Sequence, residues 1–323
     1  MRVLITGITG FAGGHLAMHL ARNTAVELYG IDRNATRLPA ALQGRATVFE
    51  GDLLVESFVK EVLQQVRPTA VFHLAGQAFV PAAWENPWET FQLNVLPQLN
   101  LFKASLELGL TARFVTVTSG KLYGHVPPER MPLNEETPFQ PDNPYDLSKV
   151  TQDLMARQYF FSHNLPVIRA RPFNHIGPRQ SPNFVTSSFA RQIARAEAGL
   201  ALPVVKVGNL SAARDFSDVR DVVRAYALLM DNGRPGQAYN IGSGRAVTIR
   251  QILDMLVGMS RVTIKVEPDP ARMRPVDQPI SYGDIGKIAA HVGWRPEISL
   301  EESLRQVLDY WREAVIVESR ADD

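Results

Sequence analysis

Short hydrophobic runs alternate with helix-like segments through the first half of the chain, and this alternation limits the possible folds more than any other feature. The first run, RVLITG at residues 2–7, contains β-branched residues and stops at a glycine. The segment at residues 13–23 then places apolar residues at helical spacing. Similar hydrophobic runs follow at residues 26–32, 46–53, 70–76, 113–119 and 165–172. Strands that alternate with helices require crossover connections, so the sequence predicts an α/β fold with a doubly wound parallel sheet.

The character of the sequence changes after Pro172. Residues 174–183 are rich in proline, glycine, asparagine and serine, and helix and strand fragments then alternate irregularly. The run GQAYNIGSG at residues 236–244 has the pattern of one more strand, which we expect to return to the sheet. We therefore predict a main domain and a smaller, discontinuous C-terminal lobe. The expected boundaries are 1–171 with about 215–242 for the main domain, and 172–214 with 243–323 for the lobe.

Charge and cysteine content exclude several classes of function. The chain has 34 basic and 33 acidic residues without a like-charge block, so we expect neither nucleic acid nor a membrane as partner. It contains no cysteine, which excludes disulfides, thiolate metal sites and a cysteine nucleophile and fits a reducing cytoplasm. The first apolar run is too short for a membrane span. No histidine and carboxylate spacing suggests a metal site.

The first predicted turn carries three glycines, Gly7, Gly10 and Gly13, between a strand and a helix. Glycine permits a tight turn and lets backbone N–H groups approach a pyrophosphate at a helix N-terminus. The spacing is GxxGxxG rather than GxGxxG, and three glycines alone could be ordinary turn residues. Asp32 and Asp52 end the next two strands, where they could meet the adenosine ribose and the adenine edge. Together these positions predict dinucleotide binding by a Rossmann-type sheet.

The residues after Asp32 leave the choice between NAD and NADP open. An aspartate here repels a 2′-phosphate and favours NAD. Arg33 and Arg37 follow directly and could pair with that phosphate. We predict NAD(H) or NADP(H), with a slight preference for NAD.

Tyr145 and Lys149 lie four residues apart and so share one face of a predicted helix. A nearby ammonium favours the phenolate and would lower the tyrosine pKa, preparing it to exchange a proton with a hydroxyl or ketone. This spacing is common, and a surface pair is the alternative. Ser119 ends a neighbouring predicted strand and could hydrogen-bond the same substrate oxygen.

The glycine spacing, HLAG at residues 73–76, Asn94, Ser119 and the Tyr145–Lys149 pair together resemble the extended short-chain dehydrogenase/reductase family over essentially the whole chain. The resemblance implies that tyrosine is the general acid/base, that lysine holds the nicotinamide ribose and tunes the tyrosine, and that serine positions the reacting oxygen. It also implies a homodimer formed through the helices that follow Asn86 and Tyr145. The implied cofactor contacts are Gly7, Gly10, Phe11, Ala12, Gly13, Asp32, Arg33, Asp52, Leu53, Leu74, Ala75, Gly76, Asn94, Tyr145, Lys149, Phe173 and His175.

Two segments of the second lobe, residues 170–185 and 207–221, are similar to two branches of this family, GDP-mannose 4,6-dehydratase and GDP-4-keto-6-deoxy-D-mannose reductase. The likeness implies a GDP-linked sugar as substrate, with arginine forks on its diphosphate. Each arginine taken singly could be a solvated surface residue. The implied substrate contacts are Val80, Ser119, Asn174, Val185, Arg214, Arg274 and Asp277.

Lys121 separates the two branches. A dehydratase needs an additional acid/base for elimination, and in that branch an acidic residue stands two places after the serine or threonine, where this chain has Lys121. Reduction of a C4 ketone needs only Ser119, Tyr145 and Lys149. Some reductase relatives also carry an acid at the position of Lys121. Lys121 itself could be a solvated residue at a loop tip. We predict an NAD(P)H-dependent reductase that forms GDP-D-rhamnose or its C4 epimer. The alternatives are the dehydratase, a nucleotide-sugar epimerase that retains NAD, and a dinucleotide-binding regulator without activity.

Three further features have structural interpretations. His73 lies on a buried strand and is expected to be a satisfied core histidine, whereas His175 could touch the cofactor. Gly242-Ser243-Gly244 is expected to be a turn, because no strand-to-helix elbow surrounds a serine nucleophile there.

Overall fold

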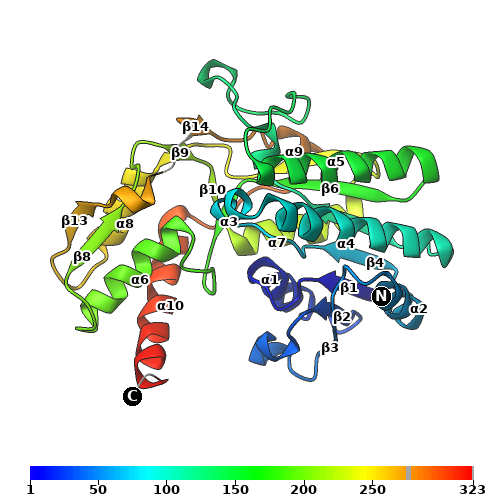
Figure 1. Cartoon of the computed structure of the whole chain (residues 1–323), viewed down its shortest axis with the longest axis horizontal. Coiled ribbons are helices and arrows are strands. Elements are labelled where there is room, and N and C mark those ends of the chain that lie inside the picture. The colour runs from blue at the N-terminus through cyan, green and yellow to red at the C-terminus, as the bar shows by residue number, and fades with distance from the viewer. Residues whose placement is uncertain (274–277, 322–323) are drawn as a thin grey trace.

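The computed structural model describes residues 1–273 and 278–321. A large domain built on one sheet lies beside a smaller lobe, which occupies the left of Figure 1. The chain crosses between them more than once, because β11 (Ala238–Ile241) returns to the sheet after the first part of the lobe. The predicted return of this strand is therefore confirmed, while the exact domain boundaries stay a prediction.

Among the described residues, seven parallel strands form the main sheet in the order β11-β6-β5-β4-β1-β2-β3. The order of the first six strands in the chain is that of a Rossmann fold, and the predicted fold class is confirmed. Each observed strand ends at its predicted last residue or one to three residues before it. The polar and glycine residues at the predicted ends have already left the sheet at its carboxyl edge. The remaining strands are β1 (Arg2–Thr6), β2 (Glu27–Asp32), β3 (Ala46–Glu50), β4 (Ala70–His73), β5 (Arg113–Val117) and β6 (Val167–Pro172).

Helices cover both faces of the sheet. On one face α1 (Phe11–Leu20) and α7 (Val219–Asn232) pack on one another and on the strands. On the other face lie α2 (Glu56–Val66), α4 (Pro87–Glu107) and α5 (Pro144–His163). Side chains alternate between the two faces, as a strand requires, so Ile5 belongs to the first core and Leu4 to the second.

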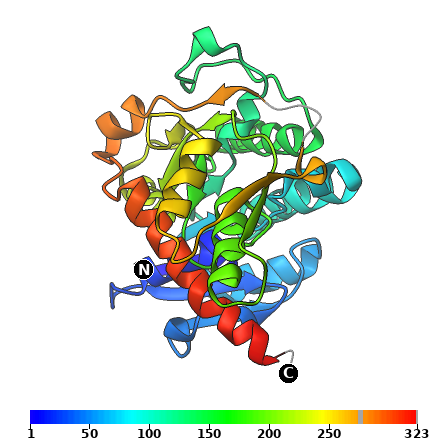
Figure 2. The same cartoon turned by 90° about the vertical axis from the view of Figure 1, so that its left-hand side faces the viewer.

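The lobe has its own hydrophobic core, formed mainly by α6 (Val185–Glu197), α8 (Ile249–Gly258) and α10 (Leu300–Ala321). Figure 2 shows α10, in red, running along the outside of the lobe next to α6. Arg312 joins the two helices by donating to Glu197 at 2.7 Å. The lobe also contains a parallel pair of strands, β8 (Val204–Val207) and β13 (Lys265–Pro268). None of the helices in the described ranges is long and apolar enough to cross a membrane.

Short elements connect the two parts. Strand β7 pairs with β10, and β9 pairs with both β12 and β14. Helix α9 packs on β11 and α7, and the buried Trp294 that follows it belongs to a core of the main domain. The bounds are α3 (Val80–Glu85), β7 (Asn174–Ile176), β9 (Ala213–Arg214), β10 (Phe216–Asp218), β12 (Val247–Thr248), β14 (Ile280–Ser281), α9 (Gly286–Val292), and the 3-10 helices η1 (Ala35–Arg37), η2 (Ala40–Leu42), η3 (Gly120–Tyr123), η4 (Pro128–Arg130) and η5 (Pro270–Arg272).

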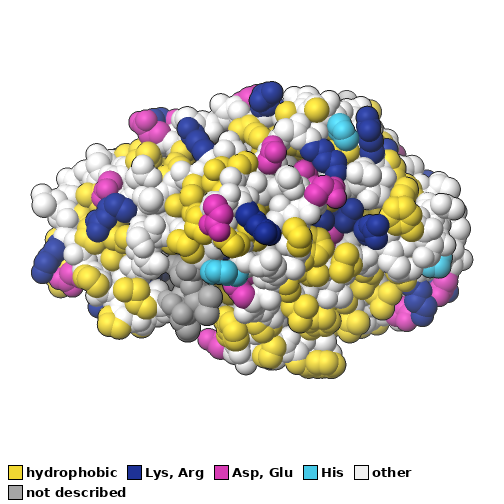
Figure 3. Space-filling model, turned by 90° about the horizontal axis from the view of Figure 1, so that it is seen from above, with side chains coloured by type: hydrophobic (Ala, Val, Ile, Leu, Met, Phe, Trp, Pro, Cys, Tyr) yellow, Lys and Arg dark blue, Asp and Glu magenta, His cyan; other side chains and the backbone are white. Residues whose placement is uncertain are grey.

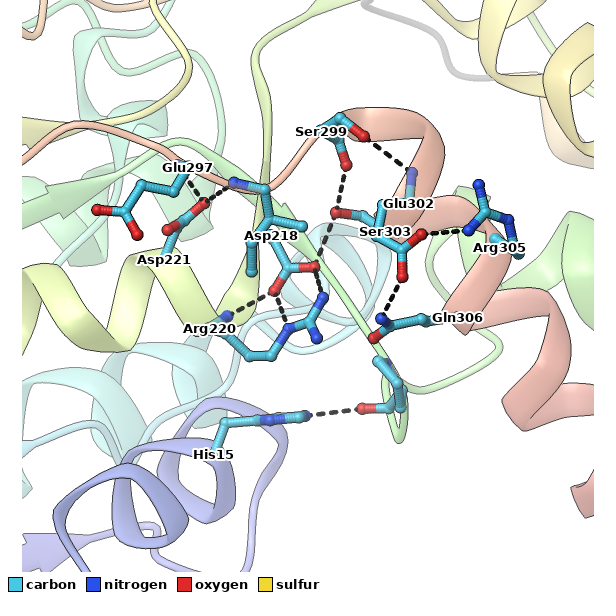
Figure 4. Close-up of polar contacts among 12 residues, drawn as sticks. His15, Asp218, Arg220, Asp221, Glu297, Ser299, Glu302, Ser303, Arg305 and Gln306 are labelled. Carbon is cyan, nitrogen blue, oxygen red and sulfur yellow. Dashed lines mark hydrogen bonds and ion pairs between the residues drawn. The ribbon is translucent and has the colours of Figure 1, made fainter. Parts of the chain in front are cut away.

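Two aspartates at the start of α7 fasten the last part of the lobe to the main domain (Figure 4). Asp218 accepts a hydrogen bond from the hydroxyl of Ser303 on α10 at 2.7 Å. Asp221 accepts from the backbone N–H groups of Glu297 at 2.9 Å and Ile298 at 2.8 Å. These contacts fix the segment before α10 against a helix of the sheet domain.

Replacing Asp221 with alanine should destabilise the chain, because two backbone N–H groups would lose a buried charged acceptor. The expected loss is about 3 kcal/mol in the free energy of unfolding. Asp254→Ala is the matched control, since this aspartate is exposed and pairs with Arg250 across α8, and it should change stability by less than about 0.5 kcal/mol. Urea denaturation of both variants measures the effect, and equal losses would contradict the anchoring role of Asp221.

Candidate active site

The turn between β1 and α1 depends on glycine at two positions. Gly7 has a φ of 73°, in the left-handed region that other residues rarely adopt. A Cβ atom on Gly13 would lie 2.0 Å from the carbonyl oxygen of Gly7. Helix α1 therefore starts directly against the turn, with Gly10 as an N-cap that has no capping side chain. No side chain caps the first N–H groups of α1, and uncapped N–H groups at a helix N-terminus are suited to binding a pyrophosphate.

The two aspartates predicted at strand ends lie near this turn. Asp32 ends β2 and accepts hydrogen bonds from the N–H groups of Thr9, at 3.1 Å, and Arg33, at 2.8 Å. Asp52 follows β3 by two residues and accepts from the N–H of Leu54 at 2.9 Å. Asp32 thus fastens the glycine turn to the second strand, at the sheet edge where a dinucleotide would lie.

An aromatic stack connects α1 with the segment after β6. The rings of Phe11 and His175 are parallel, with their centres 5.8 Å apart. Sequence reasoning missed Arg179 in the same region. Its backbone φ is 74°, and its Nη1 atom lies 2.6 Å from where a Cβ on Gly14 would be. A cationic side chain thus lies on the helix that follows the glycine turn, and its strained backbone gives no sequence signal.

The loop after β4 meets α4 and α5 at Asn94. Its carboxamide accepts from the N–H of Gln77 at 2.7 Å and donates to the hydroxyl of Ser148 at 2.8 Å. A Cβ on Gly76 would lie 2.7 Å from Asn94 Oδ1 and 3.7 Å from Lys149 Nζ. The structure therefore brings Gly76, Asn94 and Lys149 together, although they come from three elements.

Ser119 and Tyr145 lie next to one another at the carboxyl edge of the sheet. Burial raises the pKa of Tyr145 to about 12, and a hydrogen bond with the side chain of Ser119 acts in the opposite direction. The Ser119 hydroxyl also accepts from the N–H of Lys121 at 3.1 Å, which fixes its position at the start of η3. The pair is thus arranged to share one hydrogen-bonded oxygen.

Lys149 is buried beside this pair, and burial lowers its pKa to about 8. Its ammonium donates to the side-chain oxygen of Gln152 at 2.7 Å and lies 5.9 Å from the centre of the Tyr145 ring. The expected lowering of the tyrosine pKa by Lys149 is not seen, because the desolvation of the phenol outweighs the other influences on it.

Lys121 is not the solvated residue at a loop tip that the sequence left as an alternative. It is half-buried in η3, and its charge acts on Asp146, the residue directly after Tyr145. Asp146 is 2% exposed, and its Oδ1 atom has no hydrogen-bond partner. Burial raises its pKa to about 7, against the opposing effect of Lys121. Sequence reasoning missed Asp146 because an acid in the first turn of a helix is ordinary.

The predicted substrate residues come from both parts of the chain. Phe79 and Phe184, next to Val80 and Val185, form an edge contact with ring centres 6.1 Å apart, which brings the starts of α3 and α6 together. Asn174 is half-buried on β7, and Arg214 is buried on β9. The remaining two predicted residues, Arg274 and Asp277, lie outside the described residues.

Other predicted features have clear places in the structure. Leu53, Leu74, Ala75 and Phe173 are buried or half-buried at the carboxyl edge of the sheet, whereas Arg33 is exposed. The segment at residues 242–244 is a bend that belongs to no helix or strand, which agrees with the predicted turn. Ser243 donates through its N–H and its hydroxyl to Asp215. No cluster of histidine and carboxylate side chains suited to a metal ion occurs within residues 1–273 and 278–321.

Replacing Asp146 with asparagine should stabilise the chain increasingly as pH rises. The folded-state pKa of about 7 lies above the ordinary value of 3.8, so the protonated acid contributes stability below pH 3.8, and that contribution is lost as the pH rises through 7. Asparagine resembles the protonated acid and does not ionise. The variant should therefore exceed the parent in free energy of unfolding at pH 8, by up to roughly 4 kcal/mol.

Urea denaturation at several pH values between 4 and 8 measures this difference, with Asp254→Asn as the exposed control. The control should show no rising difference from the parent over that interval. An Asp146→Asn variant that is no more stable than the parent at pH 8 would contradict the conclusion that burial outweighs the charge of Lys121 at this carboxyl group.

Comparison with known proteins agrees with this geometry. The family model described as GDP-mannose 4,6 dehydratase matches residues 4–307. A GDP-6-deoxy-D-mannose reductase from Pseudomonas aeruginosa is 37% identical over 97% of this chain and 98% of its own length. A GDP-mannose 4,6-dehydratase from Vibrio cholerae is 27% identical over 95% and 92%. The solved structure of RMD from Pseudomonas aeruginosa complexed with NADPH superposes with a TM-score of 0.86 at 35% identity, covering 97% and 99%. The predicted resemblance is confirmed, and the chain belongs to the GDP-mannose 4,6 dehydratase family of extended short-chain dehydrogenase/reductases.

Proposed function

We propose that this chain reduces the C4 ketone of GDP-4-keto-6-deoxy-D-mannose with NAD(P)H and forms GDP-D-rhamnose or its C4 epimer. The observation that carries the proposal is the grouping of Ser119, Tyr145 and Lys149 beside a cationic Lys121. Reduction needs one hydride and one proton, and these side chains can supply and direct the proton. The 37% identity with a GDP-6-deoxy-D-mannose reductase supports the same reaction.

The cofactor has a suitable cradle in the glycine turn. Gly7, Gly13 and Gly76 leave room where side chains would clash with neighbouring atoms. The N-terminus of α1 would bind the pyrophosphate, and Asp32 the adenosine ribose. A bound nicotinamide supplies the hydride. NAD is slightly preferred because Asp32 would repel the 2′-phosphate of NADP. Arg33 and Arg37 would instead favour NADP, and a related solved structure is complexed with NADPH. An assay with both cofactors decides between them.

The side chains then have separate roles in proton transfer. Tyr145 would donate its proton to the C4 oxygen as the hydride arrives at C4. Ser119 would hydrogen-bond the same oxygen and hold it in position. Lys149 would stabilise the resulting phenolate with its ammonium and hold the nicotinamide ribose. Because burial raises the pKa of the phenol, Tyr145 begins the reaction with its proton in place.

The alternative reaction is 4,6-dehydration, which one observation favours. Dehydration must remove a proton from C5, and a cationic Lys121 is a poor base for this step. Asp146, however, is a buried carboxyl next to Tyr145 with a pKa near neutrality. If Asp146 reached the sugar, it could act as the missing base. We rank the reductase first because Asp146 has no hydrogen bond that directs it to the site of Ser119.

Tyr145→Phe should lower kcat by at least about 100-fold, because it removes the proton donor. The assay mixes the chain with GDP-4-keto-6-deoxy-D-mannose and either NADPH or NADH. Oxidation of the cofactor is followed by nicotinamide absorbance, and the sugar product is identified. Tyr159→Phe on the same helix is the matched control and should keep the parent rate. Conversion of GDP-mannose to a 4-keto sugar without net cofactor use would support the dehydratase instead. Cofactor binding with equal trace activity in parent and Tyr145→Phe would support a regulator.

We also propose that the chain forms a homodimer through α4 and α5. Leu147, Leu154 and Phe161 recur every seven residues on α5 and are exposed, as are Trp88 and Leu96 on α4. Figure 3 shows hydrophobic side chains gathered at the lower right, on the side of the molecule that faces the reader in Figure 1. Exposed apolar side chains at this spacing are typical of a helix–helix interface. A location in the cytoplasm stays a prediction.

The double variant Leu154→Glu/Phe161→Glu should be a monomer, because four charges would meet in the dimer interface. Sedimentation equilibrium of parent and variant measures the mass. Val317→Glu on α10 is the control, since Val317 is also exposed but lies on the lobe, and it should leave the dimer intact. A monomeric parent, or a dimeric double variant, would contradict this interface.

A further inference from the structure

Three polar side chains lie in one row across the centre of the sheet. Thr6 on β1 is the register partner of His73 on β4, and His73 is the partner of Thr116 on β5. All three are at most 1% exposed. They follow Leu4, Val71 and Phe114 by two residues each and so face the same helices, α4 and α5.

The hydrogen bonds of Thr6 fix the protonation of His73. The Thr6 hydroxyl oxygen accepts from the N–H groups of Leu74 and Ala75, each at 3.2 Å. Both lone pairs are then in use, so its proton is donated to Nδ1 of His73, 2.8 Å away. His73 is consequently neutral and carries its own proton on Nε2. Burial, with a contribution from the Lys149 charge, lowers the pKa of His73 to about 3 and agrees with this assignment.

Two polar atoms in this row have no hydrogen-bond partner. They are Nε2 of His73 and the hydroxyl oxygen of Thr116, both inaccessible to solvent. They belong to residues that lie directly opposite one another on neighbouring strands. His73 was expected to be a satisfied core histidine, and only one of its two nitrogens is satisfied by the protein. Buried polar groups of this kind are usually bridged by an internal water.

The ammonium of Lys149 lies just beyond the end of β4, 3.7 Å from where a Cβ on Gly76 would be. Its charge acts on His73 across the space between β4 and α5. One ammonium proton is used by Gln152. The titratable groups shown to interact with the ammonium are His73 from the sheet and Tyr145 from α5 itself. Helix α4 contributes the uncharged side chain of Asn94, which lies with the ammonium beside Gly76.

We propose that His73 and Thr116 hold one buried water beneath Lys149, and that this water makes both of them positioning residues for the reduction proposed above. The water accepts the Nε2 proton of His73 and one ammonium proton, and it donates to the hydroxyl of Thr116. Three polar partners suffice to retain a buried water. By accepting from the ammonium it favours the charged form of Lys149 and opposes the effect of burial.

A crystal structure of the full chain that resolves internal waters tests the site without reference to activity. The expected result is a water within about 3.2 Å of His73 Nε2, Thr116 Oγ1 and Lys149 Nζ. A direct bond between His73 and Thr116, or a dry space between them, would overturn the proposal. Because this measurement needs no substrate, its failure is distinct from a failure of the proposed reaction.

The pH dependence of turnover tests the link to Lys149. Thr116→Val keeps the shape of the side chain but removes the hydroxyl, so the alkaline limb of kcat should move to lower pH by about one unit. Thr116→Ser should restore the limb. Thr118→Val is the matched control, because the Thr118 hydroxyl already donates to the carbonyl of Ala170, and it should lower stability without moving the limb. An unmoved limb in Thr116→Val, or an equal movement in Thr118→Val, would overturn the role of the water.

Discussion

The contact between Gly13 and the carbonyl of Gly7 is the constraint on which the arrangement of the site depends. Any side chain at residue 13 would overlap that carbonyl, so only glycine lets α1 start directly beside β1. This close approach directs the N-terminus of α1 to the carboxyl edge of the sheet. Asp32 fastens the same turn to β2 through the N–H of Thr9. The turn that would hold a cofactor therefore depends on close backbone packing, which the side chain of Asp32 reinforces.

Burial governs the chemistry next to this cradle. The phenol of Tyr145 and the carboxyl of Asp146 are both desolvated, which raises their pKa values and favours their protonated, neutral forms. Desolvation also favours the neutral form of Lys149, so it lowers the pKa of that ammonium. A site that starts with a protonated tyrosine suits proton donation to a ketone. The same burial gives weight to the polar row through Thr6, His73 and Thr116, because His73 in that row interacts with the charge of Lys149.

Much of the fold could be predicted from the sequence because alternating hydrophobic runs specify a parallel sheet. The return of β11 was also predictable, since residues 238–241 repeat that pattern. The acid/base properties of the site could not be predicted from the sequence. The lowering of the Tyr145 pKa was expected from its spacing to Lys149, but desolvation depends on tertiary packing. Asp146 was missed because an acid in the first turn of a helix is ordinary. The burial of His73 was expected, but its unsatisfied nitrogen depends on cross-strand register, which gives no signal in a single sequence.

The central claim is that the grouping of Ser119, Tyr145 and Lys149 performs a net reduction. The most direct test is the stoichiometry of nicotinamide oxidation against sugar product in one reaction mixture that starts from GDP-4-keto-6-deoxy-D-mannose. The account predicts that one reduced nicotinamide is oxidised for each GDP-6-deoxyhexose formed. Sugar conversion by the purified chain without net nicotinamide oxidation would contradict it and would point to a reaction that regenerates its cofactor.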